Sequence, residues 1–121
     1  MPDIKLIGLD LDGTLLTTTK ELTENTKKVL TQALDAGIEV LVATGRPFSG
    51  IPKELQKLPG IHYALTSNGA RVLDIRTEKV IIEQLLPLES AIKALRIFEK
   101  YDTLCEIYFH GQGYAEEKKL S

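Results

Sequence analysis

The chain has 121 residues, a net charge of −2 and a composition that is 43% hydrophobic and 26% charged, which favours one globular domain and argues against disorder. With 15 basic against 17 acidic residues and only 6% aromatics, general nucleic-acid binding is not expected. No apolar run approaches the roughly 20 residues of a membrane span, and the lone Cys105 cannot form an internal disulfide. We therefore expect a cytoplasmic protein without membrane or nucleic-acid partners.

The first 43 residues have the pattern of a strand, a helix and a second strand. An apolar run over residues 4–9 ends in turn residues and predicts a buried strand. A helix is predicted after Thr23, which suits its N-cap, with Gly37 as its C-terminal stop. Residues 38–43 are rich in β-branched side chains and predict a second buried strand. Because one helix connects the two strands, we expect them to be parallel.

The middle of the chain predicts three further elements. Residues 48–58 have the pattern of a second helix, with Pro52 in its first turn if the helix begins near Ile51. Residues 63–66 predict a third short strand. The apolar runs 71–73 and 80–84 lie on either side of a polar segment and predict an antiparallel hairpin.

The pattern changes after Pro87. Apolar residues then recur at helical spacing and predict a helix up to Tyr101, and residues 104–109 predict a strand. We expect two parts in an α/β chain: residues 1–86, with a parallel sheet, and residues 87–121, the beginning of a different unit.

Polar residues follow each of the three predicted parallel strands. Ligands of open parallel sheets bind beyond the carboxyl ends of the strands, so we expect these residues to share one site. Carboxylates beside phosphate-binding groups make sense when Mg²⁺ lies between them. The sequence therefore predicts phosphoryl chemistry on a small phosphorylated metabolite. The candidate residues are Asp10, Asp12, Gly13 and Thr14 after the first strand, Thr44, Gly45 and Arg46 after the second, and Asn68 and Gly69 after the third.

The carboxylates of Asp10 and Asp12, two residues apart, can divide the catalytic work. One attacks phosphorus and forms an aspartyl-phosphate. The other, kept protonated, donates its proton to the leaving oxygen and then accepts one from the hydrolytic water.

Three segments carry a resemblance to a known superfamily. The stretch Leu9–Leu16, with the sequence LDLDGTLL, resembles the first motif of the haloacid dehalogenase-like hydrolases. Val42–Pro47 and Ser67–Ala70 resemble hallmarks of the Cof-type sugar-phosphate phosphatase branch. The resemblance implies a partial Rossmann-like three-layer sandwich with a parallel sheet, followed after residue 86 by the start of an inserted α/β cap domain.

The resemblance also implies roles for individual residues. Asp10 would be the nucleophile and a Mg²⁺ ligand, and Asp12 the general acid and base, with its backbone carbonyl on the metal. Thr44 would bind the phosphate. The residues that would line the pocket are Gly45, Arg46 and Asn68.

The resemblance leaves two catalytic motifs unmatched, since the Lys and the acidic metal-binding segment that follow the cap in relatives are absent from these residues. We therefore expect the N-terminal portion of a longer Mg²⁺-dependent phosphatase acting on small sugar phosphates. Two alternatives remain open: a phosphomutase of the same superfamily, and a catalytically silent fragment that associates through an open sheet edge.

Each motif also has a plain structural interpretation. Residues 10–14 could be a tight turn that only ends a strand. Thr44 and Gly45 could be common turn residues at the end of a strand. Asn68-Gly69 is the commonest hairpin-turn signal.

Overall fold

The computed structural model of the chain describes residues 2–117. They divide into two compact units, one ending at Glu83 and the other beginning at Gln84. Within the described residues, no helix is both long and apolar enough to cross a membrane.

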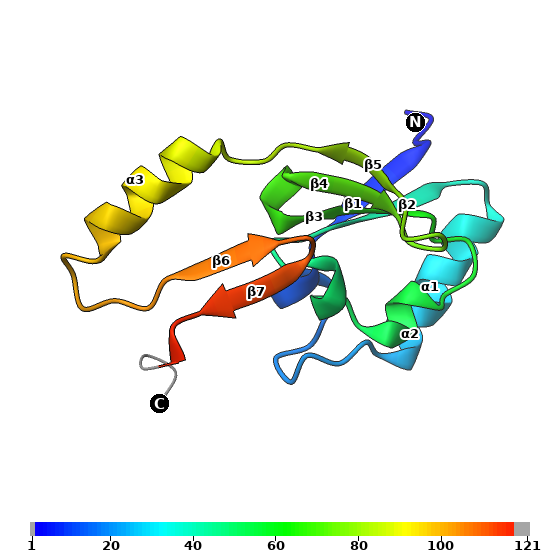
Figure 1. Cartoon of the computed structure of the whole chain (residues 1–121). Coiled ribbons are helices and arrows are strands. Elements are labelled where there is room, and N and C mark those ends of the chain that lie inside the picture. Colours follow the sequence, from blue (N-terminus) through cyan, green and yellow to red (C-terminus); the bar gives the residue numbers. More distant parts are fainter. Residues whose placement is uncertain (1, 118–121) are drawn as a thin grey trace. The chain divides into compact units, whose positions relative to one another are not determined.

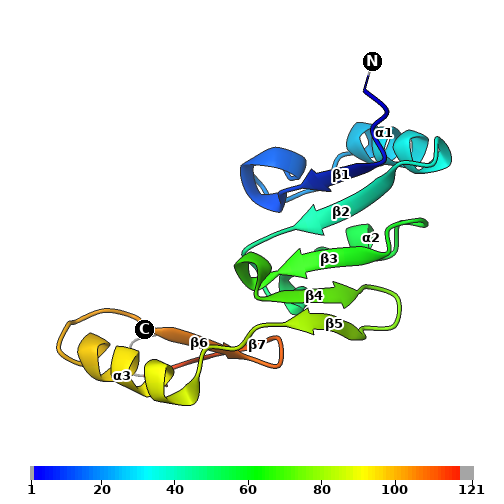
Figure 2. The ribbon, with the colours of Figure 1, turned by 90° about the horizontal axis from the view of Figure 1, so that it is seen from above.

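The first unit is built on a five-stranded sheet with the strand order β1-β2-β3-β4-β5 (Figures 1 and 2). The pairs β1·β2 and β2·β3 are parallel, and the pairs β3·β4 and β4·β5 are antiparallel. This mixed sheet confirms the predicted α/β class, the parallel strands and the hairpin. The strands are β1 (Leu6–Leu9), β2 (Glu39–Ala43), β3 (Tyr63–Thr66), β4 (Arg71–Asp74) and β5 (Val80–Glu83).

Helix α1 (Glu24–Asp35) connects β1 to β2, as predicted. The hydroxyl of Thr23 accepts a hydrogen bond from the backbone N–H of Thr26 at 3.1 Å and caps the helix. Gly37 ends it with a φ of 81°, a conformation that glycine adopts without strain. Figure 1 shows α1 and α2 on the same face of the sheet.

The single helix predicted over residues 48–58 is wrong. The structure has a 3₁₀ turn, Phe48–Gly50, and a separate helix α2 of four residues, Lys53–Gln56. The break lies at Ile51, which is extended with ψ of 128° because the residue before Pro52 is pushed out of the helical region.

The core of the first unit lies between the sheet and its helices. Leu30 of α1, Val40 and Val42 of β2, and Leu55 of α2 are buried there. Leu11, which directly follows Asp10 in sequence, is also buried in this cluster. The buried side chain of Leu11 therefore anchors the turn after β1 to the hydrophobic core.

The second unit consists of helix α3 (Leu88–Phe98) and an antiparallel hairpin of β6 (Glu106–Phe109) and β7 (Gln112–Ala115). The helix ends three residues before the predicted Tyr101, and β6 begins two residues later than predicted. Helix α3 and strand β6 were expected from the sequence, whereas β7 was not predicted.

Candidate active site

The first part of the site is a single π-like turn, Leu11–Leu15, that follows β1. Asp10 begins the turn, and its Oδ1 accepts a hydrogen bond from the backbone N–H of Leu11 at 2.9 Å. Leu11 and Leu15 are buried, whereas Asp10 and Asp12 are exposed. The alternation of leucine and aspartate therefore anchors the turn in the core and leaves both carboxylates at the surface.

Gly13 allows this turn to close. Its φ of 73° lies in the left-handed region, where a side chain would be strained. Thr14 follows it on the exposed side of the same turn. Both predicted phosphate-binding residues therefore lie on the segment that carries the two aspartates.

The loops after β2 and β3 are joined by hydrogen bonds. The backbone N–H of Thr44 donates to the carbonyl of Leu65 at 2.8 Å, and the N–H of Asn68 donates to the carbonyl of Thr44 at 3.2 Å. The N–H of Ser67 donates to the carbonyl of Arg46 at 3.0 Å. The buried hydroxyl of Thr44 accepts from the N–H of Arg46 at 3.1 Å. The second and third strand ends therefore form one connected layer.

Gly45 and Asn68 are in close contact. A Cβ atom on Gly45 would lie 2.9 Å from Oδ1 of Asn68, closer than side-chain atoms normally approach. Asn68 has a φ of 57° and Gly69 a φ of 90°, both in the left-handed region. Asn68-Gly69 thus lies in the loop 67–70 that joins the antiparallel strands β3 and β4, as the hairpin-turn signal indicates, and Ser67–Gly69 of this loop form a 3₁₀ turn.

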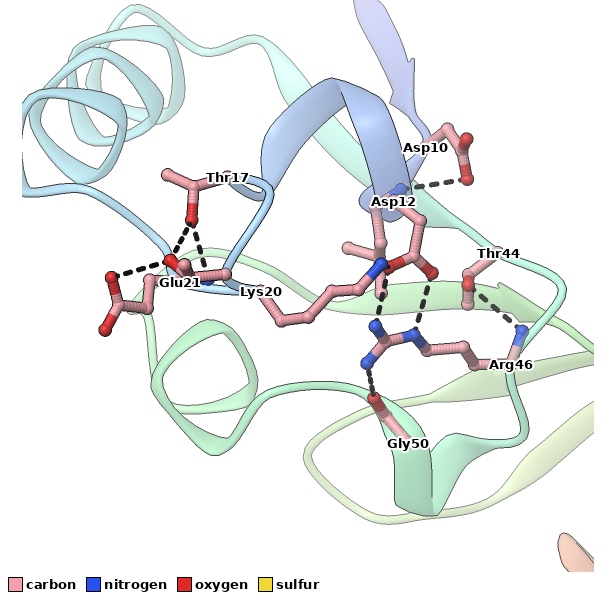
Figure 3. Close-up of polar contacts among 10 residues, drawn as sticks. Asp10, Asp12, Thr17, Lys20, Glu21, Thr44, Arg46 and Gly50 are labelled. Carbon is pink, nitrogen blue, oxygen red and sulfur yellow. Dashed lines mark hydrogen bonds and ion pairs between the residues drawn. The ribbon is translucent and has the colours of Figure 1, made fainter.

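Arg46 connects the second strand end to the first (Figure 3). Its Nε donates to Oδ2 of Asp12 at 2.9 Å and its Nη2 to Oδ1 at 2.6 Å. Its Nη1 donates to the carbonyl of Gly50 at 2.8 Å. This two-point contact is the geometry in which a guanidinium binds a carboxylate most strongly.

Lys20 is a second cation at the same carboxylate. Its Nζ lies 2.8 Å from Oδ1 of Asp12. The sequence predicts only a polar loop here, and no pattern in Thr17–Lys20 shows that the loop turns back over Asp12. Lys20 is the residue of this cluster that sequence reasoning missed.

The two cations lower the pKa of Asp12. Hydrogen bonds from Arg46, and next from Lys20, lower the pKa of Asp12 from 3.8 to about 2. Asp12 in turn raises the pKa of Arg46. Both contacts favour the ionised carboxylate, whereas the expected general acid has to carry a proton. The ion pair seen here therefore works against the protonated form that this role needs.

Asp10 and Asp12 carry the two carboxylates at this edge of the sheet, and these carboxylates point in different directions (Figure 3). In Figure 3 the carboxylate of Asp12 points towards Arg46 and Lys20, and that of Asp10 points away from them. Among residues 2–117 no group of three or more His, Cys, Asp or Glu side chains is placed to hold a metal. The donors are hard oxygens of the kind that Mg²⁺ prefers, and Mg²⁺ commonly uses one or two carboxylates together with water and substrate oxygens.

Comparison with known proteins gives relatives for almost the whole chain. A protein of Buchnera aphidicola subsp. Baizongia pistaciae is 35% identical over 120 residues, which cover 96% of this chain and 43% of that protein. The pyridoxal phosphate phosphatase YbhA of Escherichia coli is 34% identical over 113 residues, covering 93% of this chain and 39% of YbhA.

Solved structures of phosphatases also resemble this chain. The subclass IIB sugar phosphatase BT4131 superposes with a TM-score of 0.82 at 28% identity, covering 95% of this chain and 46% of that one. BT1666 of Bacteroides thetaiotaomicron, a phosphatase of the same superfamily, gives 0.79 at 26% identity, covering 93% and 41%. The chain thus spans less than half the length of these relatives. Residues 7–120 match the haloacid dehalogenase-like hydrolase family, and the chain belongs to that family.

Proposed function

We propose that this chain carries the nucleophile and the phosphate-binding loops of a Mg²⁺-dependent phosphomonoester hydrolase. The observation that supports this most is the link between the first two strand ends, where Arg46 binds both carboxylate oxygens of Asp12. It brings the aspartate turn against the loop that contains Thr44. Nucleophile, acid and phosphate donors are the groups that phosphoryl transfer needs in one place.

Asp10 is the proposed nucleophile. It is exposed, and the N–H of Leu11 fixes the orientation of its carboxylate. A carboxylate oxygen forms a bond to phosphorus as the bond to the leaving oxygen breaks, and this leaves an aspartyl-phosphate. Water then attacks phosphorus, which releases inorganic phosphate and restores the carboxylate.

Asp12 is the proposed acid and base. It gives a proton to the leaving oxygen in the first step and takes one from the attacking water in the second. Arg46 and Lys20 favour the ionised form of Asp12 because they lower its pKa to about 2, so a substrate phosphate that draws these cations away would ease its protonation. The same exchange would place Arg46 on the phosphate.

Mg²⁺ would be held by the Asp10 carboxylate and the Asp12 backbone carbonyl, and it supplies charge neutralisation between the carboxylates and the phosphate. Thr44, Gly45 and Asn68 offer hydroxyl, backbone and amide groups at the neighbouring strand ends. Gly13, Thr14 and Gly69 border the same edge of the sheet.

The proposed substrates are small phosphate monoesters, with sugar phosphates as the first class to examine. Named relatives include the sugar phosphatase BT4131 and the pyridoxal phosphate phosphatase YbhA. Both names give a small phosphorylated metabolite as the substrate of the enzyme. Residues 87–121 are proposed as the beginning of the cap domain that selects among such substrates.

The experiment is phosphate release from an aryl phosphate, measured with and without Mg²⁺. We expect Mg²⁺-dependent turnover by the wild-type chain and by Asp35→Asn, an exposed carboxylate at the end of α1. Asp10→Asn should show none. Measurable turnover that is the same in Asp10→Asn and Asp35→Asn would refute the role of Asp10, whereas no turnover by the wild-type chain would favour the catalytically silent fragment.

A second candidate function is association, favoured by the position of β1 at one edge of the sheet. Leu6 of this strand is 56% exposed, and an unpaired strand edge is a template for pairing with another chain. We propose pairing through β1 with a second copy of the chain. Light scattering would show a dimer that Leu6→Lys converts to a monomer, and a wild-type monomer at all concentrations would overturn the idea.

A further inference from the structure

We propose that Lys20 is a substrate-binding residue, whose ammonium group binds the phosphate of the substrate together with Arg46. This inference rests on the proposed function. It adds to the site a cation that none of the motifs contains.

The geometry places both cations on one oxygen atom. Nζ of Lys20 and Nη2 of Arg46 lie 2.8 Å and 2.6 Å from Oδ1 of Asp12 (Figure 3). Two nitrogens that share one oxygen are close enough for a single phosphate group, with its several oxygens, to accept from both. The Lys20 side chain is 58% exposed, so a ligand from solvent can reach its ammonium group.

The loop that carries Lys20 is an ordered turn held by hydrogen bonds. Its ends are joined because the N–H of Thr17 donates to the carbonyl of Glu21 at 3.0 Å, and the N–H of Glu21 donates to Oγ1 of Thr17 at 3.1 Å. The N–H of Lys20 donates to the carbonyl of Thr17 at 2.9 Å. Lys20 itself has a φ of 66°, a conformation that is uncommon for residues other than glycine. The turn therefore holds a lysine over Asp12 where a glycine would fit with less strain.

The charge of the phosphate is consistent with a second cation at this position. A phosphate monoester carries a charge of about −1.5 to −2 at pH 7. Arg46 supplies one positive charge, and Lys20 beside it supplies a second.

One competing explanation is that Lys20 acts only through Asp12, by neutralising a carboxylate that would otherwise repel phosphate. A double-mutant cycle separates the two roles. In Asp12→Asn that repulsion is already gone. A further Lys20→Met change then weakens phosphate binding only if Lys20 contacts the phosphate itself.

The experiment is calorimetric titration of the 121-residue chain with inorganic phosphate in the presence of Mg²⁺. A lost charged hydrogen bond predicts that Lys20→Met weakens phosphate binding by roughly ten- to a hundredfold. The same loss is expected in the Asp12→Asn background, and Lys20→Arg should retain most of the affinity. Lys28→Met, which removes an exposed lysine on α1, is the matched control and should bind as wild type does.

The outcomes separate this inference from the proposed function. Phosphate binding that Arg46→Met abolishes and Lys20→Met leaves unchanged would overturn the role of Lys20 and leave the phosphatase site standing. A loss in Lys20→Met that disappears in the Asp12→Asn background would also overturn it. Absence of phosphate binding by the wild-type chain would overturn both.

Discussion

Replacing Leu11 by alanine should destabilise the first unit more than any exposed change on β1 or the aspartate turn. Leu11 is 0% exposed and lies between the two aspartates in sequence. The substitution removes three methylene-sized groups, and at about 0.8 kcal/mol each the lost transfer free energy is about 2.4 kcal/mol. The cavity left behind brings the expected loss of unfolding free energy to about 3–4 kcal/mol. A domain of this size has roughly 5–10 kcal/mol in total.

Urea denaturation followed by circular dichroism measures this loss. Leu6→Ala is the matched control, because Leu6 is 56% exposed on the strand that leads into the same turn. We expect it to cost less than about 1 kcal/mol. The comparison holds only if both variants keep the wild-type m-value. A loss below about 1 kcal/mol for Leu11→Ala would refute the reasoning that the core anchors the aspartate turn.

Three further predictions concern the helix cap, the glycine contact and the ion pair. Thr23→Ala removes the N-cap of α1 and should lower the free energy of unfolding by about 1 kcal/mol; an unchanged urea midpoint would contradict this. Gly45→Ala should displace the Asn68 side chain, whose Oδ1 would lie 2.9 Å from the new Cβ, without unfolding the chain. NMR would show shifted Asn68 amide resonances, and unshifted ones would contradict the contact. Because the pKa of Asp12 falls from 3.8 to about 2, the ion pair with Arg46 stabilises the fold fully above the unfolded value. The stability advantage of wild type over Asp12→Asn should therefore shrink as the pH falls from about 4 to about 2, and an advantage that persists below that range would contradict the ion pair.

Much of the first unit follows from local sequence signals. The helix after Thr23 has both its cap and its glycine stop, and β3 has turn residues at its end, so their bounds are close to those predicted. In the segment 48–58 the local signals conflict. Its apolar residues fit a helix, but the restriction that Pro52 places on Ile51 breaks it into two short pieces.

The site could be predicted as far as topology determines it. Parallel strands end at one edge of the sheet, which is why Asp12, Arg46 and Asn68 could be expected near one another. The composition of a loop does not determine its path. The position of Lys20 over Asp12 could therefore be seen only in the structure. The same contact lowers the pKa of Asp12, whereas the motif alone led us to expect a carboxyl group that is kept protonated.

Asp10 is proposed to attack phosphorus. The most direct test is rapid-quench mass spectrometry of the chain after mixing with an aryl phosphate and Mg²⁺. We expect one added phosphoryl group on the peptide that contains Asp10, present in Asp35→Asn and absent in Asp10→Asn. A phosphoryl group on another peptide, or aryl phosphate hydrolysis with no phosphorylated chain at any quench time, would contradict it.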